Sequence, residues 1–335
     1  MITTLTPRTG RVLVVGCGQL GSRHLQAAAT VAAVSEIEVI DPSPEALATG
    51  RERAAQVADR RVDVPMRWLG TLDTASTGGD LCVVATQAEG RAALIAEIVE
   101  KLGYRSFLLE KVVTQSVEEY ESLLRLAEHH SLSIWVNCKT RAYPFHKRVK
   151  SLLDPAEPVV LTEVGGNHGL GNNGVHTADL FTFYDGGDRI DPVGASVDPV
   201  SHPSKRGSTV FDLSGALHGS TPKGSQFSLT YQGGHAAAPC TTIATSSYRC
   251  VVDQMNRWAW ESDAASGWVW RPVPFEGDLT VSNMSRAFIA DILATGACEL
   301  PTLADCAPAH RFILGELLPH FRRLISPSLE ACPVT

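Results

Sequence analysis

The sequence lacks the patterns that mark several large classes of protein. Its eight cysteines form no C-x-x-C pair and its eleven histidines include no H-E-x-x-H spacing, so we expect neither a disulfide framework nor a metal site. No apolar run approaches the roughly 18 residues that a membrane helix needs, and the first apolar stretch is too short for a signal sequence. These absences predict a cytoplasmic protein with reduced thiols and no membrane partner.

Basic clusters are missing as well. The formal net charge is −7 and no run of Lys or Arg interrupts it, so the sequence excludes nucleic acid as an expected partner. An apolar fraction of 44% is typical of a globular protein. A chain of 335 residues is longer than one hydrophobic core usually holds, which predicts two domains.

The strongest positive signal is a glycine-rich run near the N-terminus. An apolar strand at 12–15 leads into a G-x-G-x-x-G pattern and then into an alanine-rich helical segment. In such a turn the glycines allow a tight bend and close approach of the backbone to a pyrophosphate, while the helix N-terminus offers unpaired N–H groups to the anion. The residues expected to contact the cofactor here are Gly16, Cys17, Gly18, Gln19, Leu20 and Gly21.

An acidic residue follows at the distance that a dinucleotide site requires. A second short strand at 36–40 ends in Asp41, twenty residues after Gly21, where a carboxylate accepts hydrogen bonds from the adenosine ribose. The same carboxylate would repel a 2′-phosphate, and no Arg follows it at once. The sequence therefore predicts NAD as the cofactor in preference to NADP.

Strands and helices alternate through the first 140 residues. This alternation predicts a doubly wound parallel sheet, with ligands at the carboxyl ends of its strands. Thr86, Glu110 with Lys111, and Asn137 stand at three such ends, and Thr86, Glu110 and Asn137 are expected to contact the cofactor. Strands are expected at 12–15, 36–40, 64–69, 81–85, 106–110 and 132–137, and helices at 45–59, 88–102 and 116–130.

The pattern changes after about residue 140. Short strands separated by Gly, Ser and Pro indicate a mainly antiparallel, open sheet. We therefore expect an α/β protein with an N-terminal Rossmann domain at 1–140 and an α+β domain at 141–335 that binds substrate and forms an oligomer. Strands are expected at 158–164, 209–217, 226–232, 241–252, 257–261 and 268–272, and helices at 145–153, 279–295 and 303–325.

Four tryptophans alternate within the expected sheet. Trp258 and Trp260 would face one side of a strand, as would Trp268 and Trp270. Such pairs can stack on a sugar ring, or they can cover a helix or a neighbouring subunit. The second interpretation is preferred because one face of an open sheet must be buried somewhere, and it predicts a homodimer or homotetramer.

Two groups could carry proton transfer to or from an alcohol. Lys111 follows the apolar strand at 106–110 and so emerges at the binding edge of the sheet, while His176 and Asp179 share one face at the start of a helix. Each also has a plain structural interpretation. Lys111 could be a solvated lysine at a strand end, and His176 a histidine satisfied by Asp179.

Taken together, these features resemble a definite family. The chain is similar to the glucose-fructose oxidoreductase, inositol dehydrogenase and MocA-like (Gfo/Idh/MocA) oxidoreductases over most of its length. The resemblance rests on the glycine run, on Val-Val-Ala-Thr at 83–86, on Glu-Lys-Val at 110–112 in place of the usual Glu-Lys-Pro, and on Gly-Val-His-Thr-Ala-Asp-Leu at 174–180.

The resemblance implies roles for single residues. Lys111 would lie beside the nicotinamide and the reacting hydroxyl, and His176 would be the acid/base. Relatives commonly carry Asp four residues before that histidine, where this chain has Asn172, which can orient a group but adds no negative charge. The residues expected to be catalytic are thus Lys111, His176, Asn172 and Asp179, and those expected to bind substrate are Lys111, Arg141, Tyr143, Asn172 and His176.

The sequence therefore predicts an NAD-dependent oxidoreductase acting on a secondary alcohol or ketone of a sugar, sugar nucleotide or cyclitol. Two alternatives stay open. One is a redox-neutral epimerase or eliminase of the same fold, in which tightly held NAD is reduced and reoxidised in one cycle. The other is a regulatory or scaffold protein that binds NAD without turnover, because fold-level analogy alone does not decide chemistry.

Overall fold

The computed structural model describes residues 10–167, 169–204, 207–276 and 280–335. The chain divides into two compact units that interleave along the sequence. The helix that follows the second sheet belongs to the first unit, so the division does not fall at a single chain position. The first unit comprises Met1–Glu110, Ser122–Asn137 and Asp278–Leu303, and the second comprises Lys111–Glu121, Cys138–Gly277 and Ala304–Thr335.

The first unit is built on a six-stranded sheet whose neighbouring strands all run parallel. The strand order β3-β2-β1-β4-β5-β6 places β1 at the centre, where β1 and β4 are almost entirely buried because helices cover both faces. The strands are β1 (Gly10–Val15), β2 (Val34–Ile40), β3 (Met66–Leu69), β4 (Leu81–Val84), β5 (Ser106–Leu109) and β6 (Ser133–Val136).

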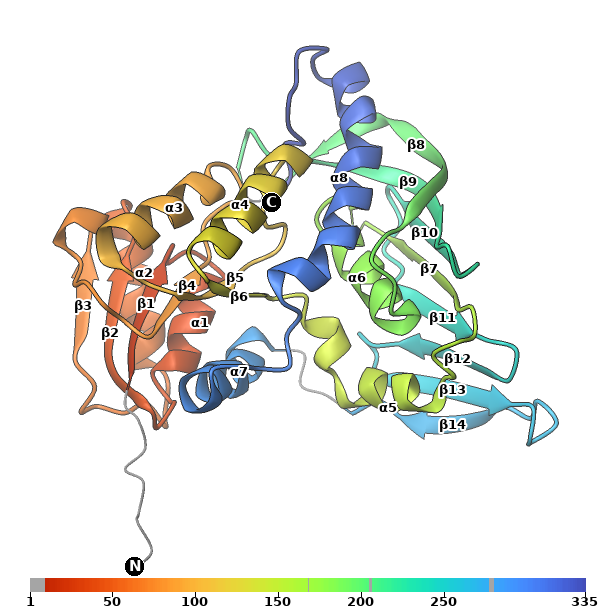
Figure 1. The fold of residues 1–335 in the computed structure, drawn as a ribbon, viewed down its shortest axis with the longest axis horizontal. Coiled ribbons are helices and arrows are strands. Elements are labelled where there is room, and N and C mark those ends of the chain that lie inside the picture. The colour runs from red at the N-terminus through yellow and green to blue at the C-terminus, as the bar shows by residue number, and fades with distance from the viewer. Residues whose placement is uncertain (1–9, 168, 205–206, 277–279) are drawn as a thin grey trace, which may run out of the picture. The chain divides into compact units, whose positions relative to one another are not determined.

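Helices lie on both faces of this sheet. Helices α3 and α4 cover one face, and α1 and α7 lie together on the other (Figure 1). The 3-10 helix η1 (Leu72–Thr74) connects β3 to β4. The helices of this unit are α1 (Gly21–Ala28), α2 (Pro44–Ala55), α3 (Arg91–Leu102), α4 (Val117–His129), whose first residues group with the second unit, and α7 (Val281–Thr295).

The second unit contains an eight-stranded sheet in the order β14-β13-β12-β11-β7-β10-β9-β8. Among the described residues β7 and β10 pair in parallel and the other neighbouring pairs are antiparallel. The strands are β7 (Val160–Gly166), β8 (Asp191–Pro203), β9 (Phe211–Ser220), β10 (Gln226–Gln232), β11 (Cys240–Ala244), β12 (Tyr248–Asp253), β13 (Trp258–Asp263) and β14 (Arg271–Pro274).

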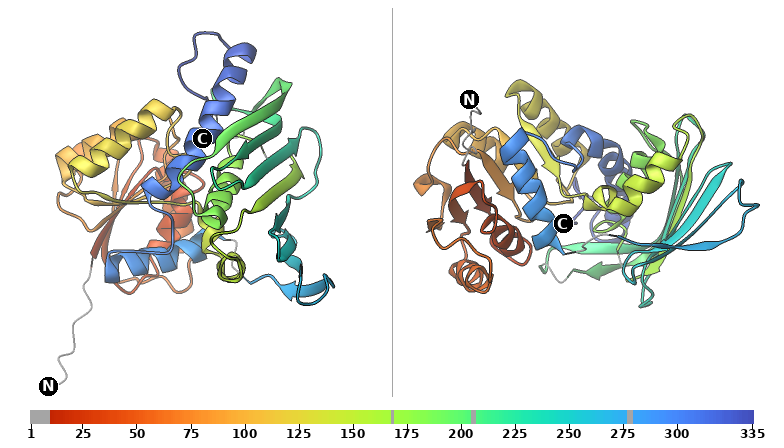
Figure 2. Two further views of the ribbon diagram at one scale, coloured as in Figure 1. Left: turned by 45° about the vertical axis from the view of Figure 1, so that its right-hand side comes forward. Right: turned by 90° about the horizontal axis from the view of Figure 1, so that it is seen from below.

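Helices cover one face of this sheet, as Figure 2 shows. Phe227 of β10 packs against Phe181 and Phe312, with ring centroids 5.2 and 5.6 Å away. These contacts tie two helices to the centre of the sheet and form its apolar core. The helical segments are η2 (Lys139–Ala142), α5 (Pro144–Leu152), α6 (Gly174–Asp185) and α8 (Leu303–Leu324).

The opposite face of the sheet remains accessible to solvent. Val160 and Val164 of β7 and Trp258 and Trp260 of β13 are each 40% exposed or more. Large apolar side chains gathered on one exposed face are typical of protein contact surfaces. The homodimer or homotetramer expected from the sequence stays a prediction.

The fold class expected from the sequence is confirmed, with three local corrections. The expected strand at 241–252 is two strands, β11 and β12, because the Thr245 hydroxyl accepts hydrogen bonds from Ser247 N and Tyr248 N and so forms a turn. Strand β8 was not expected, since it contains three prolines, which an edge strand tolerates. The strand expected at 268–272 begins only at Arg271, because Trp268 has a positive φ of 65° in the preceding turn.

Two further observations concern the chain as a whole. All eight cysteines are free thiols, and six of them are buried. Among the described residues no helix has both the length and the apolar character needed to cross a bilayer.

Candidate active site

The glycine run after β1 forms a tight turn onto α1. Gly16 has φ of +86°, and a Cβ there would lie 2.8 Å from the backbone nitrogen of Thr86. A Cβ on Gly21 would lie 1.7 Å from the carbonyl oxygen of Gly16. Both positions therefore require glycine, because the turn packs against itself and against the end of β4.

The same turn presents unused hydrogen-bond donors. Among the described residues, the backbone N–H groups of Gly18, Gln19 and Leu20 have no acceptor, and Gly18 and Gln19 are exposed. A Cβ on Gly18 would meet no atom within 4 Å, so the backbone is open on this side. Three adjacent N–H groups at a helix N-terminus fit the pyrophosphate of a dinucleotide.

Asp41 lies beside this turn. Its Oδ2 accepts a hydrogen bond from Cys17 N at 2.7 Å and its Oδ1 accepts one from Ser43 N at 2.9 Å. A carboxylate has about four lone-pair positions, so the half-exposed side chain retains capacity for two ribose hydroxyls. The structure thus places Asp41 as the sequence predicted, at the carboxyl end of β2.

Arg53 is a residue of this region that the sequence interpretation missed. Its guanidinium donates to Ser22 Oγ at 2.6 Å and to Gln19 Oε1 at 2.7 Å. Helix α2 comes close enough because Gly50 lies against Cys17, where a Cβ would be 2.2 Å from the sulfur. Gly50 and Arg53 are three residues apart and so share one face of α2. This spacing is the sequence feature that could have indicated a close approach of the helix to the turn. Arg53 brings positive charge to the glycine turn.

A buried polar network holds Glu110 at the end of β5. Glu110 Oε1 lies 2.8 Å from His24 Nε2 and accepts a hydrogen bond from Asn137 Nδ2 at 2.7 Å. His24 Nδ1 in turn lies 2.9 Å from Ser285 Oγ of α7. All four side chains are at most 5% exposed. Glu110 and Asn137, expected at the cofactor site, are brought together, and His24 and Ser285 were not foreseen.

Thr86 is tied to the same strand ends through a buried arginine. Arg91, which is 1% exposed, donates to the main-chain oxygens of Thr86 and of Glu110. One guanidinium thus bridges the carboxyl ends of β4 and β5, which fixes the spacing of the two strand ends expected to line the cofactor.

Lys111 begins the second unit and is buried there. Its Nζ donates a hydrogen bond to the main-chain oxygen of Asn172 at 2.8 Å. Asn172 and Asn173 directly precede α6, and the N–H of His176, in the first turn of that helix, donates to the oxygen of Asn173 at 2.9 Å. The structure therefore brings Lys111, Asn172 and the helix turn that carries His176 together. The Lys111–Val112 peptide bond is cis.

Two contacts that sequence reasoning missed hold Asn172. The buried carboxylate of Asp212 accepts hydrogen bonds from Gly171 N at 2.7 Å and from Asn172 N at 3.0 Å. Burial raises the pKa of Asp212, although these N–H groups favour its charged form. The side-chain Oδ1 of Asn172 accepts a hydrogen bond from Thr335 N at 3.0 Å. No local pattern relates these three segments, which are distant in sequence.

Comparison with known proteins identifies the first unit. Residues 10–138 match the model of the oxidoreductase family with an NAD-binding Rossmann fold. These residues thus match the NAD-binding part of the Gfo/Idh/MocA oxidoreductases. The family resemblance drawn from the motifs is confirmed, and the expected cofactor agrees with the NAD-binding fold of the family. No curated protein matches the sequence.

Solved structures share the fold over nearly the whole chain. An oxidoreductase from Agrobacterium radiobacter in complex with NAD+, L-tartaric acid and magnesium is 14% identical, with 91% of this chain and 94% of that chain covered and a TM-score of 0.71. UDP-N-acetylglucosamine 3-dehydrogenase GnnA from Acidithiobacillus ferrooxidans is 18% identical, with coverage of 95% and 97% and a TM-score of 0.69. KijD10, a 3-ketoreductase from Actinomadura kijaniata in complex with TDP-benzene and NADP, is 17% identical, with coverage of 92% and 96% and a TM-score of 0.70.

Asp179 lies in the interior of the second unit. Arg141 Nε donates to its Oδ2 at 2.8 Å and Arg141 Nη2 to its Oδ1 at 2.6 Å. Burial raises the pKa of Asp179 to about 6, against the opposing effect of Arg141. Both side chains were expected to contact substrate or orient the catalytic ring. The structure instead pairs them with each other, because a buried carboxylate needs a partner for its charge.

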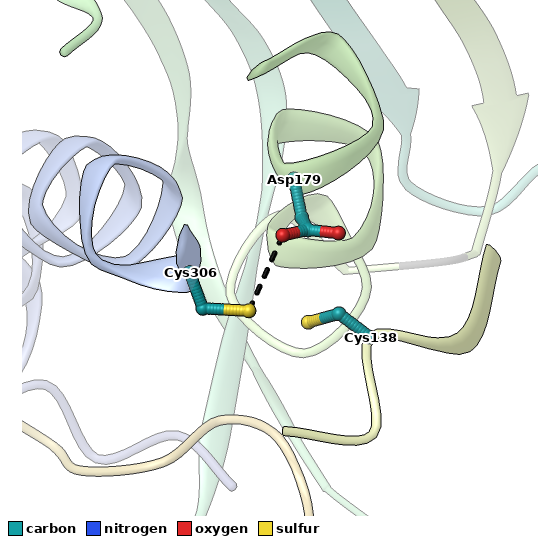
Figure 3. Close-up of side chains that lie close together, drawn as sticks. All are labelled: Cys138, Asp179 and Cys306. Carbon is teal, nitrogen blue, oxygen red and sulfur yellow. Dashed lines mark hydrogen bonds between the residues drawn. The ribbon is translucent and has the colours of Figure 1, made fainter. Parts of the chain in front are cut away.

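Asp179 also belongs to a small cluster with Cys138 and Cys306, drawn in Figure 3. The three ligand atoms lie within 4.8 Å of one another, and Cys306 Sγ donates to Asp179 Oδ1 at 3.2 Å. Burial raises the pKa of the Cys306 thiol well above its usual value, whereas a metal ligand must be a thiolate. Both carboxylate oxygens of Asp179 already accept hydrogen bonds from Arg141. The cluster is therefore suited to hydrogen bonding in the core and poorly suited to a metal.

Tyr143 differs from expectation in the same way. It is 3% exposed and packs against Phe275 and His146, with ring centroids 5.9 and 6.2 Å away. The structure places it in an aromatic cluster at the start of α5 rather than at an accessible surface. Such a side chain anchors a helix by its area of contact.

Proposed function

We propose that the protein is an NAD-dependent oxidoreductase that transfers a hydride between the nicotinamide and a secondary alcohol or ketone of a sugar, sugar nucleotide or cyclitol. The contact between Lys111 Nζ and the oxygen of Asn172 supports this proposal most directly. It brings an ammonium group to the loop from which α6 and His176 begin. GnnA and KijD10, which share the fold, are described as a sugar-nucleotide dehydrogenase and a ketoreductase.

In the direction of oxidation, His176 and Lys111 have different roles at the reacting hydroxyl group. A nicotinamide cofactor held by the glycine turn and Asp41 would supply the acceptor for the hydride of the carbinol carbon. His176 takes the hydroxyl proton, and the Lys111 ammonium stabilises the negative charge that develops on the oxygen. In the reverse direction His176 returns the proton to the oxygen of the ketone. Asn172 orients the substrate by hydrogen bonds.

The other residues expected at the site, Arg141, Asp179 and Tyr143, position the elements that carry the catalytic residues. In the proposal, the buried pair of Arg141 and Asp179 holds the first turns of α6 against η2 and so positions His176. Tyr143 anchors the start of α5. Residues 1–140 bind the cofactor, and residues 141–335 bind the substrate and carry the contacts of the oligomer. NAD is preferred to NADP because Asp41 occupies the ribose position.

Substitution of the two proposed catalytic residues tests the function. NADH formation is followed with a panel of free sugars, cyclitols and sugar nucleotides. Lys111→Ala should abolish turnover and leave NADH affinity nearly unchanged, and His176→Asn should lower kcat by at least about a hundredfold. Lys101→Ala, an exposed lysine of α3, is the matched control. Turnover retained by Lys111→Ala would remove that residue from the mechanism.

A further inference from the structure

Arg91, the first residue of α3, places a buried positive charge at the carboxyl edge of the parallel sheet. Its side chain is 1% exposed, and its guanidinium donates to the main-chain oxygens of Thr86 and Glu110, just beyond the ends of β4 and β5. Water screens such a charge much less than it screens a charge at the surface. The edge of the sheet that binds ligands in this fold therefore carries a fixed cation.

The order of the strands indicates which half of a dinucleotide this cation faces. Asp41 at the end of β2 is expected to bind the adenosine ribose, and the glycine turn after β1 is expected to bind the pyrophosphate. The strand order β3-β2-β1-β4-β5-β6 then leaves the ends of β4 and β5, on the other side of β1, for the nicotinamide half. The turn adjoins β4, since a Cβ on Gly16 would lie 2.8 Å from Thr86 N.

We propose that Arg91 is a specificity residue for the redox state of the cofactor, whose charge makes the site bind NADH more tightly than NAD+. The two forms differ in charge only at the nicotinamide ring, which is cationic in NAD+ and neutral in NADH. A fixed cation therefore repels the oxidised ring and not the reduced one. The proposal rests on the binding of NAD in the proposed function and needs no particular substrate.

Tighter binding of NADH would make the enzyme favour oxidation of its substrate. By linkage, the equilibrium on the enzyme shifts toward the form of the cofactor that binds more tightly. In that direction the carbinol carbon loses a hydride to the ring, the hydroxyl group loses its proton to His176, and the ring loses its positive charge. The repulsion by Arg91 is thus relieved as the hydride is transferred.

Two other charges belong to the same strand end. The carboxylate of Glu110 contacts His24 and Asn137, and the ammonium group of Lys111 belongs to the next residue. Both remain in the chain when only Arg91 is substituted, so a change in the ratio of the NAD+ and NADH affinities reports the charge of Arg91. Any lost attraction for the pyrophosphate is common to both forms and cancels in the ratio.

Calorimetric titration of NAD+ and of NADH without substrate tests the proposal. In the unmodified protein NADH should bind about tenfold more tightly than NAD+, or better. Arg91→Gln should reduce this preference by about tenfold, the order expected for a partly screened charge about 10 Å away. Arg91→Lys, which keeps the charge on a different side chain, should keep the preference within about threefold. Arg105→Gln, an exposed arginine just before the opposite end of β5, is the matched control and should leave it unchanged.

The possible results separate this proposal from the proposed function. NAD+ bound as tightly as NADH by the unmodified protein, or an unchanged preference in Arg91→Gln, would overturn the role of Arg91 even where sugars are oxidised. An equal loss of preference in Arg91→Lys and Arg91→Gln would also overturn it, because the bridge between the strands would then matter and the charge would not.

The expected preferences without NADH formation from any sugar would support the role of Arg91 and contradict the proposed function. Binding of neither cofactor form would contradict both. Thermal melting shows whether each variant folds, and the titration of the unmodified protein keeps the test decisive where Arg91→Gln does not fold.

Discussion

The glycine turn of the first unit and the loop before α6 of the second unit make their sites in opposite ways. In the first, the glycines make room for the backbone of the turn itself, and the exposed groups are main-chain N–H donors. In the second, glycines make room for side chains from elsewhere. A Cβ on Gly169 would lie 2.0 Å from Asp212 Oδ2, and one on Gly171 would lie 2.5 Å from Val334.

The difference shows how a site becomes visible in a sequence. A turn that packs against its own backbone requires fixed residue types at fixed spacing, so the spacing identifies it. The conformation of the loop before α6 depends on Asp212 and Thr335, which are distant from it in the sequence. Its glycines and asparagines look like those of any surface loop.

The largest test of this comparison uses two glycines of the first turn. Gly18→Ala should keep the melting temperature, because a Cβ there meets no protein atom, and should weaken NADH binding by about a hundredfold, because the pyrophosphate needs that space. Gly21→Ala should lose both binding and stability, since its Cβ would strike Gly16. NADH fluorescence titration and thermal melting measure the two effects.

The matched control is Gly315→Ala in α8, where a Cβ also meets no atom. It should leave NADH affinity unchanged. Equal NADH affinity in Gly18→Ala and the unmodified protein would refute the placement of the pyrophosphate.

A smaller effect is expected in the interior of the second unit, where a buried histidine should make the stability depend on pH. Burial lowers the pKa of His146 to about 3, from 6.5, so below pH 6.5 only the unfolded chain gains this proton. Stability is therefore complete above pH 6.5 and falls as the pH decreases toward 3. The loss should be about 2 kcal/mol at pH 5, at about 1.4 kcal/mol for each unit of pH.

Urea unfolding between pH 8 and pH 5 measures this loss. In His146→Gln, which can still hydrogen-bond Tyr184, the pH dependence should be weaker by the same amount. An equal slope in both proteins would show that another group causes it.

The smallest expected effect concerns the choice of cofactor in the first unit. Asp41→Ala should raise the affinity for NADPH by about tenfold relative to NADH, because it removes the carboxylate that repels a 2′-phosphate. Arg53 of α2, which contacts the glycine turn, then supplies a positive charge. The double variant with Arg53→Gln should lose most of this gain. Unchanged discrimination in Asp41→Ala would contradict the ribose assignment, and titration of both reduced cofactors decides it.

Much of the first unit could be predicted because its elements are local. Strand β1, the glycine turn and Asp41 follow one another within about 30 residues, and the apolar periodicity of the helices reports directly which face is buried. The contact of Arg53 with the turn could not be predicted, because it depends on how helix α2 packs against α1.

The second unit shows the opposite balance. Strand β10 lies at the expected residues. Strand β8 was not expected, because its three prolines are unusual in a strand. The side chains of Arg141, Asp179 and Tyr143 lie in the interior. The motifs that contain these residues indicated that they matter, but not whether their side chains are exposed to solvent. Whether a charged side chain contacts substrate or another side chain depends on its neighbours in space, which the motif does not contain.

By itself the sequence determined the Rossmann topology, the glycine turn and the family resemblance, because each rests on backbone geometry that short segments specify. Only the tertiary structure decided that Arg141 and Asp179 neutralise each other and that Asp212 and Thr335 hold Asn172. Burial and pairing of polar groups are properties of segments that meet from far apart in the chain, so no local pattern records them.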